Sequence, residues 1–482
     1  MSKLIPDIFA LIINQVKDER STLFNCLLVN KLWCEITIPI LWEDCLSRNL
    51  KSKCLVSLIK VLFAFLSEES KQLLIMNEIN LSFIQTQRPL FDYVSYCKSI
   101  VTFDVIRVIE ICYKSPLSEN QEKIIEKSFY DMIFDKCSYL VHLRISYTLR
   151  YGEQFMVNFM KLEDNLSNLV ELSCTQSLDE RIFYNLAKIC VNIKKLELEG
   201  SNKNNNIQGL IKLIEVQRKL EYFIYSGQKG QNWDNFCEII GQALIKHKNT
   251  LKHIHGKFQL CIPLNILSSF VNLEGIILGH YTKNMNDLRL VRLPKLRSLD
   301  VSYPKGVKEL IQNTSGDLKI VDINNPFAKN TEDDIIDIIQ IVIAIYQNCP
   351  KLEHLYISFF DTIVDALGDL LVHCNQLECI EICSKYPFYV PANGDVVLKI
   401  LSKSTSKKLE RIEMSGSWKF SVESMKEFLN NWKERKYPLY FKFDINIGCL
   451  NEEFSSMIQN FVDDNVLRFN PLKFSNFLMV LL

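Results

Sequence analysis

The sequence lacks the short motifs that mark many catalytic and nucleotide-binding sites. Its 482 residues contain no GxxxxGK[ST] phosphate loop, no GxSxG nucleophile elbow, no HExxH zinc motif and no kinase signature. Seven histidines and many carboxylates make a chance acid–base pair easy to find, so proximity alone would prove little. We therefore expect a protein that is not an enzyme and that needs no cofactor.

A net charge is also missing. Lysine and arginine together number 56, and aspartate and glutamate together number 56. A neutral chain has no broad electrostatic attraction for a polyanion. This balance argues against nucleic acid, and against an anionic membrane surface, as the main partner.

Long apolar runs are absent as well. The longest nearly apolar internal run, residues 335–346, is interrupted by Asp337 and Gln340, and a membrane span needs roughly 20 apolar residues. The apolar tail, residues 477–482, is shorter still and is expected to be a buried cap. No secretory signal is recognisable at the N-terminus. The sixteen cysteines are therefore expected to be reduced, in a protein of the cytoplasm, the nucleus or both.

Metal-ligand spacing is not found either. No CxxC pair occurs, and the nearest cluster of ligand-type residues, His373, Cys374, Cys379 and Cys383, matches no common zinc pattern. His253 and His255 alternate on one expected strand but lack a nearby third ligand. We expect no metal site and assign these side chains to packing or to the solvated surface.

The N-terminal stretch from Leu4 to Trp42 carries a strong pattern. Apolar residues recur at helical spacing after Pro6, which suits a first-turn helix position. Ser21 or Thr22 is a plausible N-cap for a second helix, and a third short helix is expected to end near Pro39. Three short helices cannot bury all of these apolar side chains, so some of them are expected to face a partner.

The same stretch resembles an F-box. Its opening Leu-Pro pattern corresponds to Leu4, Ile5 and Pro6, its middle Leu-Val-(Asn/Cys)-(Lys/Arg)-x-Trp pattern to residues 28–33, and its closing Leu-Trp pair to residues 41–42. The resemblance implies docking onto a Skp-type adaptor and, through it, onto a cullin. The residues expected to bind the adaptor are Leu4, Ile5, Pro6, Ile8, Leu11, Val29 and Trp33. The alternative is a three-helix cap for the segment that follows.

The rest of the chain divides into a connector and a repeat array. Residues 46–134 are expected to form a packed helical connector, with helical pieces at 91–96, 100–113 and 119–134. From residue 135 the phrase Leu-x-x-Leu-x-Leu recurs twelve times at a mean spacing of about 27 residues, within the range of leucine-rich repeats. The phrases begin at Leu140, Leu169, Ile193, Leu220, Leu251, Leu273, Leu296, Leu318, Leu352, Leu377, Leu409 and Tyr440.

Helical segments lie between these phrases, so each repeat is expected to be a strand and a helix that stack on their neighbours. A capping-box pattern at residues 177–180 predicts one helix start. The predicted fold class is α/β: an F-box (1–45), a helical connector (46–134), a leucine-rich-repeat solenoid with a curved parallel sheet inside and helices outside (135–450), and a C-terminal cap (451–482). The array resembles the solenoid of F-box substrate receptors.

One column of the expected sheet is acidic in its C-terminal half. The residues between the second and third leucines of the last six phrases are Asp300, Asp322, Tyr356, Glu381, Glu413 and Asp444. Stacked like charges repel one another and favour a cationic ligand. We expect this column to bind a protein substrate. The alternative is that the acids only keep the sheet soluble, with the partner on the loop rims.

The resemblance and the repeats together predict a substrate-recognition adaptor of an SCF-type ubiquitin ligase. Its F-box would dock the Skp-type adaptor, and its solenoid would bind an unidentified protein substrate. The alternative is a non-degradative F-box and leucine-rich-repeat interaction scaffold that holds a partner without degrading it.

Overall fold

The protein is described by a computed structural model. The structure describes residues 6–45, 52–81, 89–102, 105–113, 117–137, 139–145, 166–200, 207–227, 233–323, 331–386, 390–435, 437–445 and 452–468. Two compact units divide the chain: residues 1–222 with 229–232, and residues 223–228 with 233–482. In the described part of the chain, no helix combines the length and the apolar character that a membrane crossing requires.

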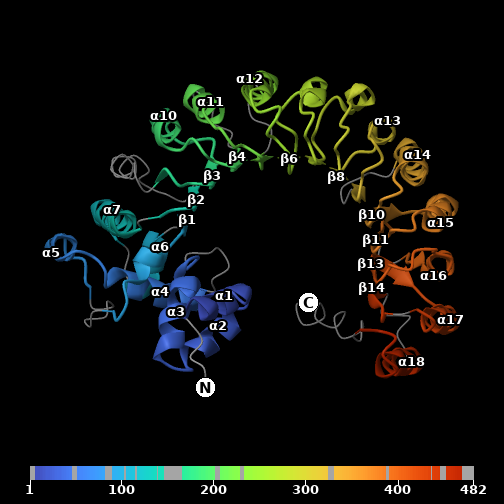
Figure 1. Ribbon diagram of the computed structural model, residues 1–482, viewed down its shortest axis with the longest axis horizontal. Helices are drawn as coiled ribbons and strands as arrows, with labels where there is room; N and C mark the ends of the chain where they lie inside the picture. Colours follow the sequence, from blue (N-terminus) through green and yellow to red (C-terminus); the bar gives the residue numbers. More distant parts are fainter. Residues whose placement is uncertain are drawn as a thin grey trace. The chain divides into compact units, whose positions relative to one another are not determined.

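The first unit begins with helices and continues into a parallel sheet (Figure 1). The helices before the sheet are α1 (Pro6–Gln15), α2 (Arg20–Leu27), α3 (Lys31–Trp42), α4 (Ser52–Phe63) and α5 (Glu68–Met76), followed by the 3₁₀ turn η1 (Tyr93–Tyr96). The sheet and its helices are β1 (Ser99–Val101), α6 (Val105–Tyr113), α7 (Glu119–Lys136), β2 (His142–Ile145), β3 (Glu171–Thr175), α10 (Glu180–Ile189), β4 (Lys195–Glu199) and α11 (Gln208–Glu215).

The second unit repeats a strand and a helix until the C-terminal part of the chain. Its strands are β5 (Tyr222–Tyr225), β6 (His253–Gly256), β7 (Gly275–Leu278), β8 (Ser298–Val301), β9 (Ile320–Ile323), β10 (His354–Phe359), β11 (Cys379–Ser384), β12 (Ala392–Asn393), β13 (Arg411–Lys419) and β14 (Tyr440–Ile445). Its helices are α12 (Trp233–Ile245), η2 (Leu264–Ser269), η3 (Met285–Leu290), α13 (Val307–Gln312), α14 (Glu332–Asn348), η4 (Asp361–Ile363), α15 (Val364–His373), α16 (Gly394–Leu401), α17 (Val422–Trp432) and α18 (Glu452–Asp463).

The leucine phrases build the core of both units. In the first unit Leu143, Leu172 and Leu196 occupy paired positions on β2, β3 and β4. In the second, Ile276, Leu299 and Val321 do the same on β7, β8 and β9, and the strands pair in parallel. These side chains are at most 2 % exposed. Within the second unit, α13 to α17 lie on the outer side of strands β8 to β14 (Figure 1). The fold is therefore a leucine-rich-repeat-like solenoid preceded by helices, and all twelve predicted phrases lie in or next to strands.

Repeat length decides which kind of helix fills each repeat. Where successive phrases are 22 or 23 residues apart, between Leu251 and Leu318, the connecting elements are η2, η3 and the six-residue α13. Where the spacing rises to 34 residues, between Leu318 and Leu352, the 17-residue α14 fits, and the Thr331 side chain caps it by accepting from the Asp334 N–H. A tighter helix reaches the next strand with fewer residues, so short repeats favour 3₁₀ geometry.

Several local predictions near the N-terminus need correction. Helix α2 begins at Arg20 after Glu19, which provides no side-chain cap, so neither Ser21 nor Thr22 is the N-cap. Helix α3 begins after Asn30, whose side chain accepts from the Trp33 N–H, and it continues through Pro39 to Trp42. A proline in a helix removes one hydrogen bond, but tertiary packing that buries Ile38 and Thr37 keeps the helix going.

Two predictions further along are also wrong. Residues 100 and 101, the start of the segment 100–113 predicted as helix, belong to β1, which pairs in parallel with β2. The pairing partner overrides local propensity, and only residues 105–113 become α6. At residues 177–180 the N-cap is Asp179, which accepts from the Arg181 N–H, so the helix begins later than the predicted capping box. The apolar tail at 477–482, expected to be a buried cap, lies outside the described residues.

Candidate functional site

The first candidate surface is the apolar face of the N-terminal helices. Seven large apolar side chains of α1, α2, α3 and the α2–α3 turn are exposed: Ile8 (43 %), Leu11 (65 %), Ile12 (50 %), Phe24 (56 %), Leu28 (85 %), Val29 (56 %) and Leu32 (38 %). The core of this part, in contrast, buries Ile13, Leu23 and Ile38. Exposed apolar side chains in this number make this surface a candidate docking site.

The predicted adaptor-binding residues take different positions. Ile8, Leu11 and Val29 are exposed, as a docking surface requires. Trp33 is only partly exposed, and its ring packs edge-on against Phe9 with the centroids 5.4 Å apart, so much of it serves the interior. Pro6 begins α1, whereas Leu4 and Ile5 lie outside the described residues. The exposed Ile12, Phe24, Leu28 and Leu32 were not among the predicted residues, although the helical spacing of Ile8 and Ile12 could have pointed to one of them.

The end of α3 contacts the segment that leads into the sheet of its own unit. The Trp42 ring stacks on Tyr93 with centroids 4.4 Å apart. The backbone N–H groups of Lys98 and Ser99 both donate to the carbonyl oxygen of Glu43, at 2.9 and 3.1 Å. The end of α3 is therefore held against η1 and the start of β1.

The second candidate surface is the strand face of the second unit. On that face Asp300, Asp322, Tyr356, Glu381 and Glu413 occupy successive paired positions on β8, β9, β10, β11 and β13; we call them the acidic row. All five are partly exposed, because the apolar residues on either side of each point to the helices and leave the row on the opposite face.

Two cationic side chains lie beside Glu413, at one end of the acidic row. Glu413 lies 3.3 Å from the Lys442 ammonium and accepts from Arg411 Nε at 2.8 Å. Arg411 in turn lies over the Tyr440 ring, 4.5 Å from its centroid. At the other end, burial and the neighbouring Asp322 raise the pKa of Asp300 to about 6. Burial, followed by Glu413 and Asp322, also raises the pKa of Glu381. These raised pKa values show that negative charge is costly along the row, so a cation placed beside Asp300 would be stabilised.

The prediction that Asp444 is the last member of the row is wrong. Glu413 pairs with Lys442, not with Asp444. The predicted phrase beginning at Tyr440 is therefore displaced by two residues, and Phe441 and Phe443 are the buried strand anchors. Aromatic residues stand at 440, 441 and 443, so the sequence is compatible with both registers of the phrase. Pairing of β14 with β13 selects one of them. Asp444 lies further along β14 and accepts from the Gly416 N–H at 3.1 Å.

Exposed aromatic residues follow three neighbouring strands of the second unit. Phe258 (39 %), Tyr281 (59 %) and Tyr303 (41 %) come after β6, β7 and β8. The carboxyl ends of parallel strands meet at one edge of a sheet, so these residues share a rim. Tyr303 follows Asp300 closely in the sequence, which places this rim beside the acidic row. The three residues are 23 and 22 residues apart, which is the spacing of the repeat in this part of the chain, but they are not among the predicted site residues.

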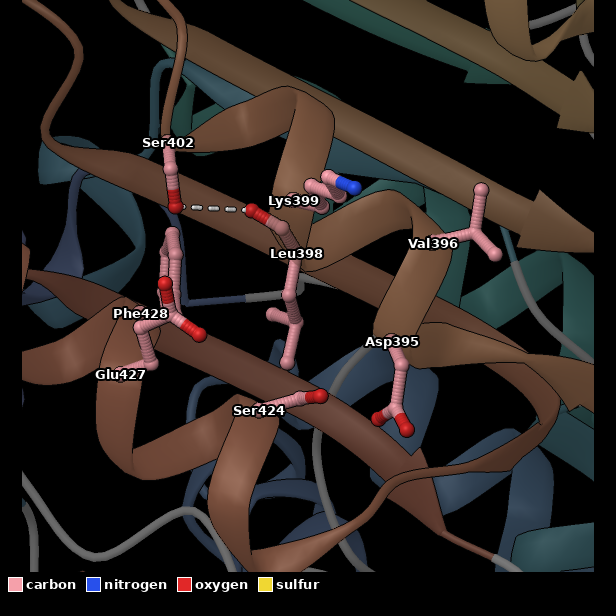
Figure 2. Close-up of a pocket in the computed structure, with 8 residues that line it drawn as sticks. All are labelled: Asp395, Val396, Leu398, Lys399, Ser402, Ser424, Glu427 and Phe428. Carbon is pink, nitrogen blue, oxygen red and sulfur yellow. Dashed lines mark hydrogen bonds between the residues drawn. The ribbon is translucent and has the colours of Figure 1, made fainter.

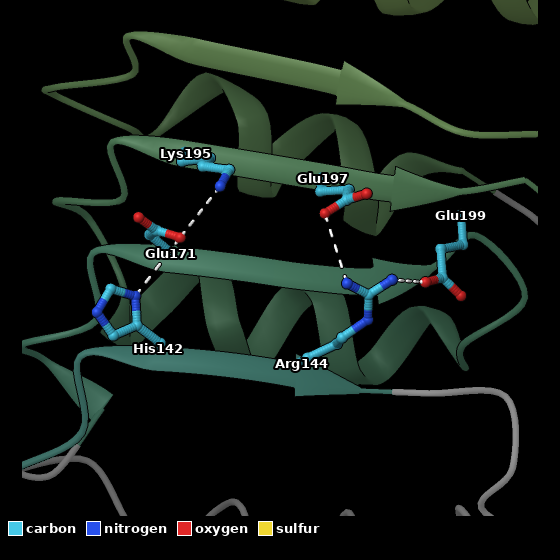
Figure 3. Close-up of polar contacts among 6 residues, drawn as sticks. All are labelled: His142, Arg144, Glu171, Lys195, Glu197 and Glu199. Carbon is cyan, nitrogen blue, oxygen red and sulfur yellow. Dashed lines mark hydrogen bonds and ion pairs between the residues drawn. The ribbon is translucent and has the colours of Figure 1, made fainter. Parts of the chain in front are cut away.

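The strand face of the first unit has the opposite character. Its charged side chains pair with one another (Figure 3). Glu171 lies 3.5 Å from His142 Nδ1 and 3.3 Å from Lys195 Nζ, and Arg144 contacts both Glu197, at 3.7 Å, and Glu199. A small pocket of about 170 Å³ opens among these strands. Alternating charges that satisfy each other stabilise the sheet and leave little net attraction for a charged partner.

A larger pocket lies between two outer helices of the second unit. Side chains of α16 and α17 line a space of about 530 Å³ (Figure 2). The Asp395 carboxylate accepts from the Ser421 N–H at 2.8 Å, and the Ser402 hydroxyl donates to the Leu398 carbonyl at 2.9 Å. These polar groups serve the helix ends. The lining residues that the structure describes include no cysteine or histidine.

The histidines and cysteines that the sequence analysis considered as metal ligands have other surroundings in the structure. His373 ends α15 and stacks on Tyr346 with centroids 5.3 Å apart, while Cys374 and Cys379 are buried. His253 and His255 share one face of β6 with their rings 5.7 Å apart. Over the described ranges, no group of three or more histidine, cysteine, aspartate or glutamate side chains is arranged to hold a metal ion.

Comparisons with known proteins give structural likeness only. No protein-family model matches the sequence, and no curated protein matches it. Among solved structures, the complex of Rad7 and Elc1 from yeast is similar at a TM-score of 0.39 and 15 % identity, covering 68 % of this chain and 73 % of that one. The complex of TLR13 with ssRNA13 is similar at a TM-score of 0.32 and 12 % identity, covering 64 % of this chain and 41 % of that one.

Proposed function

We propose that this protein is a substrate-recognition adaptor of an SCF-type ubiquitin ligase. The observation that carries the proposal is the exposed apolar surface of α1, α2 and α3, in the same stretch whose residue pattern resembles an F-box. Leu11, Leu28 and Val29 are each more than half exposed. Side chains of this kind bind a partner by removing apolar area from water, at about 25 cal/mol per Å².

The second part of the proposal concerns the substrate. The acidic row and the aromatic rim of the second unit (Phe258, Tyr281 and Tyr303) together suit a protein segment that carries lysine or arginine. Carboxylates attract the cationic groups, and tyrosine and arginine contribute strongly to protein interfaces. The internally paired charges on the strand face of the first unit make that face a weaker candidate.

The test is co-purification of a Skp-type adaptor and a cullin with the full chain. Leu11→Asp combined with Leu28→Asp should abolish adaptor capture, because both changes place a charge in the apolar surface. The matched control is Ile75→Asp combined with Met76→Asp, which alters equally exposed apolar residues on α5 (61 % and 79 %). Equal adaptor capture by the wild type and the Leu11/Leu28 variant, with both folded, would rule out docking by this surface.

A non-degradative scaffold would pass the same capture test. The two functions separate by the half-life of a co-purifying substrate after depletion of this protein. A lengthened half-life supports ligase function, whereas an unchanged half-life supports a scaffold.

A further inference from the structure

Three cysteines from separate segments of the first unit converge beside the docking helices. Cys45 follows α3, Cys97 lies between η1 and β1, and Cys137 is the C-cap residue of α7. Cys45 Sγ lies 2.9 Å from Cys97 Sγ. Cys97 and Cys137 are each 1 % exposed, and Cys45 is partly exposed.

The neighbourhood of Cys97 favours its thiolate. Hydrogen bonds from Cys137 and from Cys45 lower the pKa of Cys97 to about 5, and the pKa of both partners is raised in return. The thiolate of the pair is therefore on Cys97, with the Cys45 sulfur 2.9 Å away. The thiolate is the reactive form of a cysteine.

We propose that Cys45 and Cys97 form a reversible disulfide in response to a peroxide. The Cys97 thiolate attacks one oxygen of the peroxide, the O–O bond breaks, and the second oxygen leaves as hydroxide that takes up a proton from the solvent. This step gives a Cys97 sulfenic acid. Cys45 then attacks the Cys97 sulfur, the S–O bond breaks, and the oxygen leaves as water with the proton of the Cys45 thiol. Two thiols are oxidised by two electrons and hydrogen peroxide is reduced to two water molecules.

The Cys45–Cys97 disulfide would strengthen a contact that the fold already makes. It joins positions 52 residues apart in the chain, next to the Trp42–Tyr93 stack and the hydrogen bonds from Lys98 and Ser99 to Glu43. A covalent link here holds the end of α3 against the start of β1 and restricts the unfolded chain. A thiol reductant reverses it by exchange. This inference holds whether or not the N-terminal helices bind a Skp-type adaptor.

The experiment treats the full reduced chain with hydrogen peroxide, blocks remaining thiols by alkylation and maps tryptic peptides by mass spectrometry. The expected product links peptide 32–48, which contains Cys45, to peptide 72–98, which contains Cys97. Fragmentation of the linked pair assigns Cys45 rather than Cys34. Oxidation should also raise the melting temperature by about 5 °C, reversibly with dithiothreitol.

Variants give the controls. Cys45→Ser and Cys97→Ser should each lose the linked peptide, whereas Cys137→Ser should retain it. Thermal melting of each reduced variant shows whether that variant folds. If a variant does not fold, the peptide map of the oxidised wild type tests the proposal by itself. Absence of the 32–48 to 72–98 link in the oxidised wild type, or a link of Cys97 to Cys137 alone, would overturn the proposal.

Discussion

Asp300 on β8 and Asp322 on β9 occupy directly paired positions of neighbouring parallel strands. Burial makes the ionised state of the Asp300 carboxylate costly, and the neighbouring Asp322 carboxylate adds to that cost. The pKa of Asp300 is accordingly raised to about 6. This relationship links the stability of the repeats to pH and to the charge of any partner.

The first prediction concerns pH and stability. Because the folded-state pKa of Asp300 exceeds its unfolded value, the folded state binds the proton more tightly, and stability falls as pH rises from about 4 through 6. Asp300→Asn removes this cost and should stabilise the protein by about 1–3 kcal/mol at pH 7.5, with no gain near pH 4. Thermal melting of both proteins at the two pH values measures it. A gain that is the same at pH 4 and pH 7.5 would assign the effect to packing instead.

The second prediction concerns the charge of the substrate. Changing Asp300, Asp322 and Glu381 together to lysine should weaken substrate capture, and the loss should shrink in high salt because exposed charges are screened. Adaptor capture should not change. The control is the triple change to asparagine and glutamine, which removes the charge without reversing it and should give a smaller loss. Equal capture by the lysine variant at low salt would place the substrate elsewhere.

The third prediction concerns the core of the solenoid. Leu299 on β8 is fully buried and pairs with Ile276 and Val321 on the adjacent strands. Leu299→Asp buries an unpaired charge and should cost several kcal/mol, roughly 4. Folding should fail in the repeats around it while the N-terminal helices still capture their adaptor. Hydrogen exchange along the chain would locate the loss, and unchanged protection of β7 to β9 would contradict the assignment.

The fourth prediction concerns a backbone position on β13. Gly416 has a φ of +93°, and a Cβ there would lie 2.6 Å from the Ser384 carbonyl oxygen. Gly416→Ala should therefore destabilise the protein by about 1–3 kcal/mol, by strain and by contact with β11. The matched control is Gly368→Ala in α15, where a Cβ meets only Ile400 Cγ2 at 3.8 Å and the change should be neutral or stabilising. Equal melting temperatures for the two variants would contradict the expected strain.

The leucine phrase by itself determined the repeating architecture. Leucines at fixed spacing can be buried only when strands stack in register, so Leu273, Leu296 and Leu318 predicted β7, β8 and β9 without further information. The charge balance and the missing motifs likewise needed only composition. The acidic character of the row could also be found in sequence, because each of its members sits between two buried positions of the same phrase.

Tertiary structure decided the features for which the local sequence permits more than one outcome. Strand β1 forms because β2 offers it a partner, and the row ends at Lys442 because pairing with β13 fixes one of two aromatic registers. The exposure of Leu28 depends on how the N-terminal helices pack. The 2.9 Å contact between Cys45 and Cys97 brings together two segments that share no sequence period. Sequence periodicity reports which side chains are buried within a repeat. Only packing between distant segments decides which groups meet and which stay open to a partner.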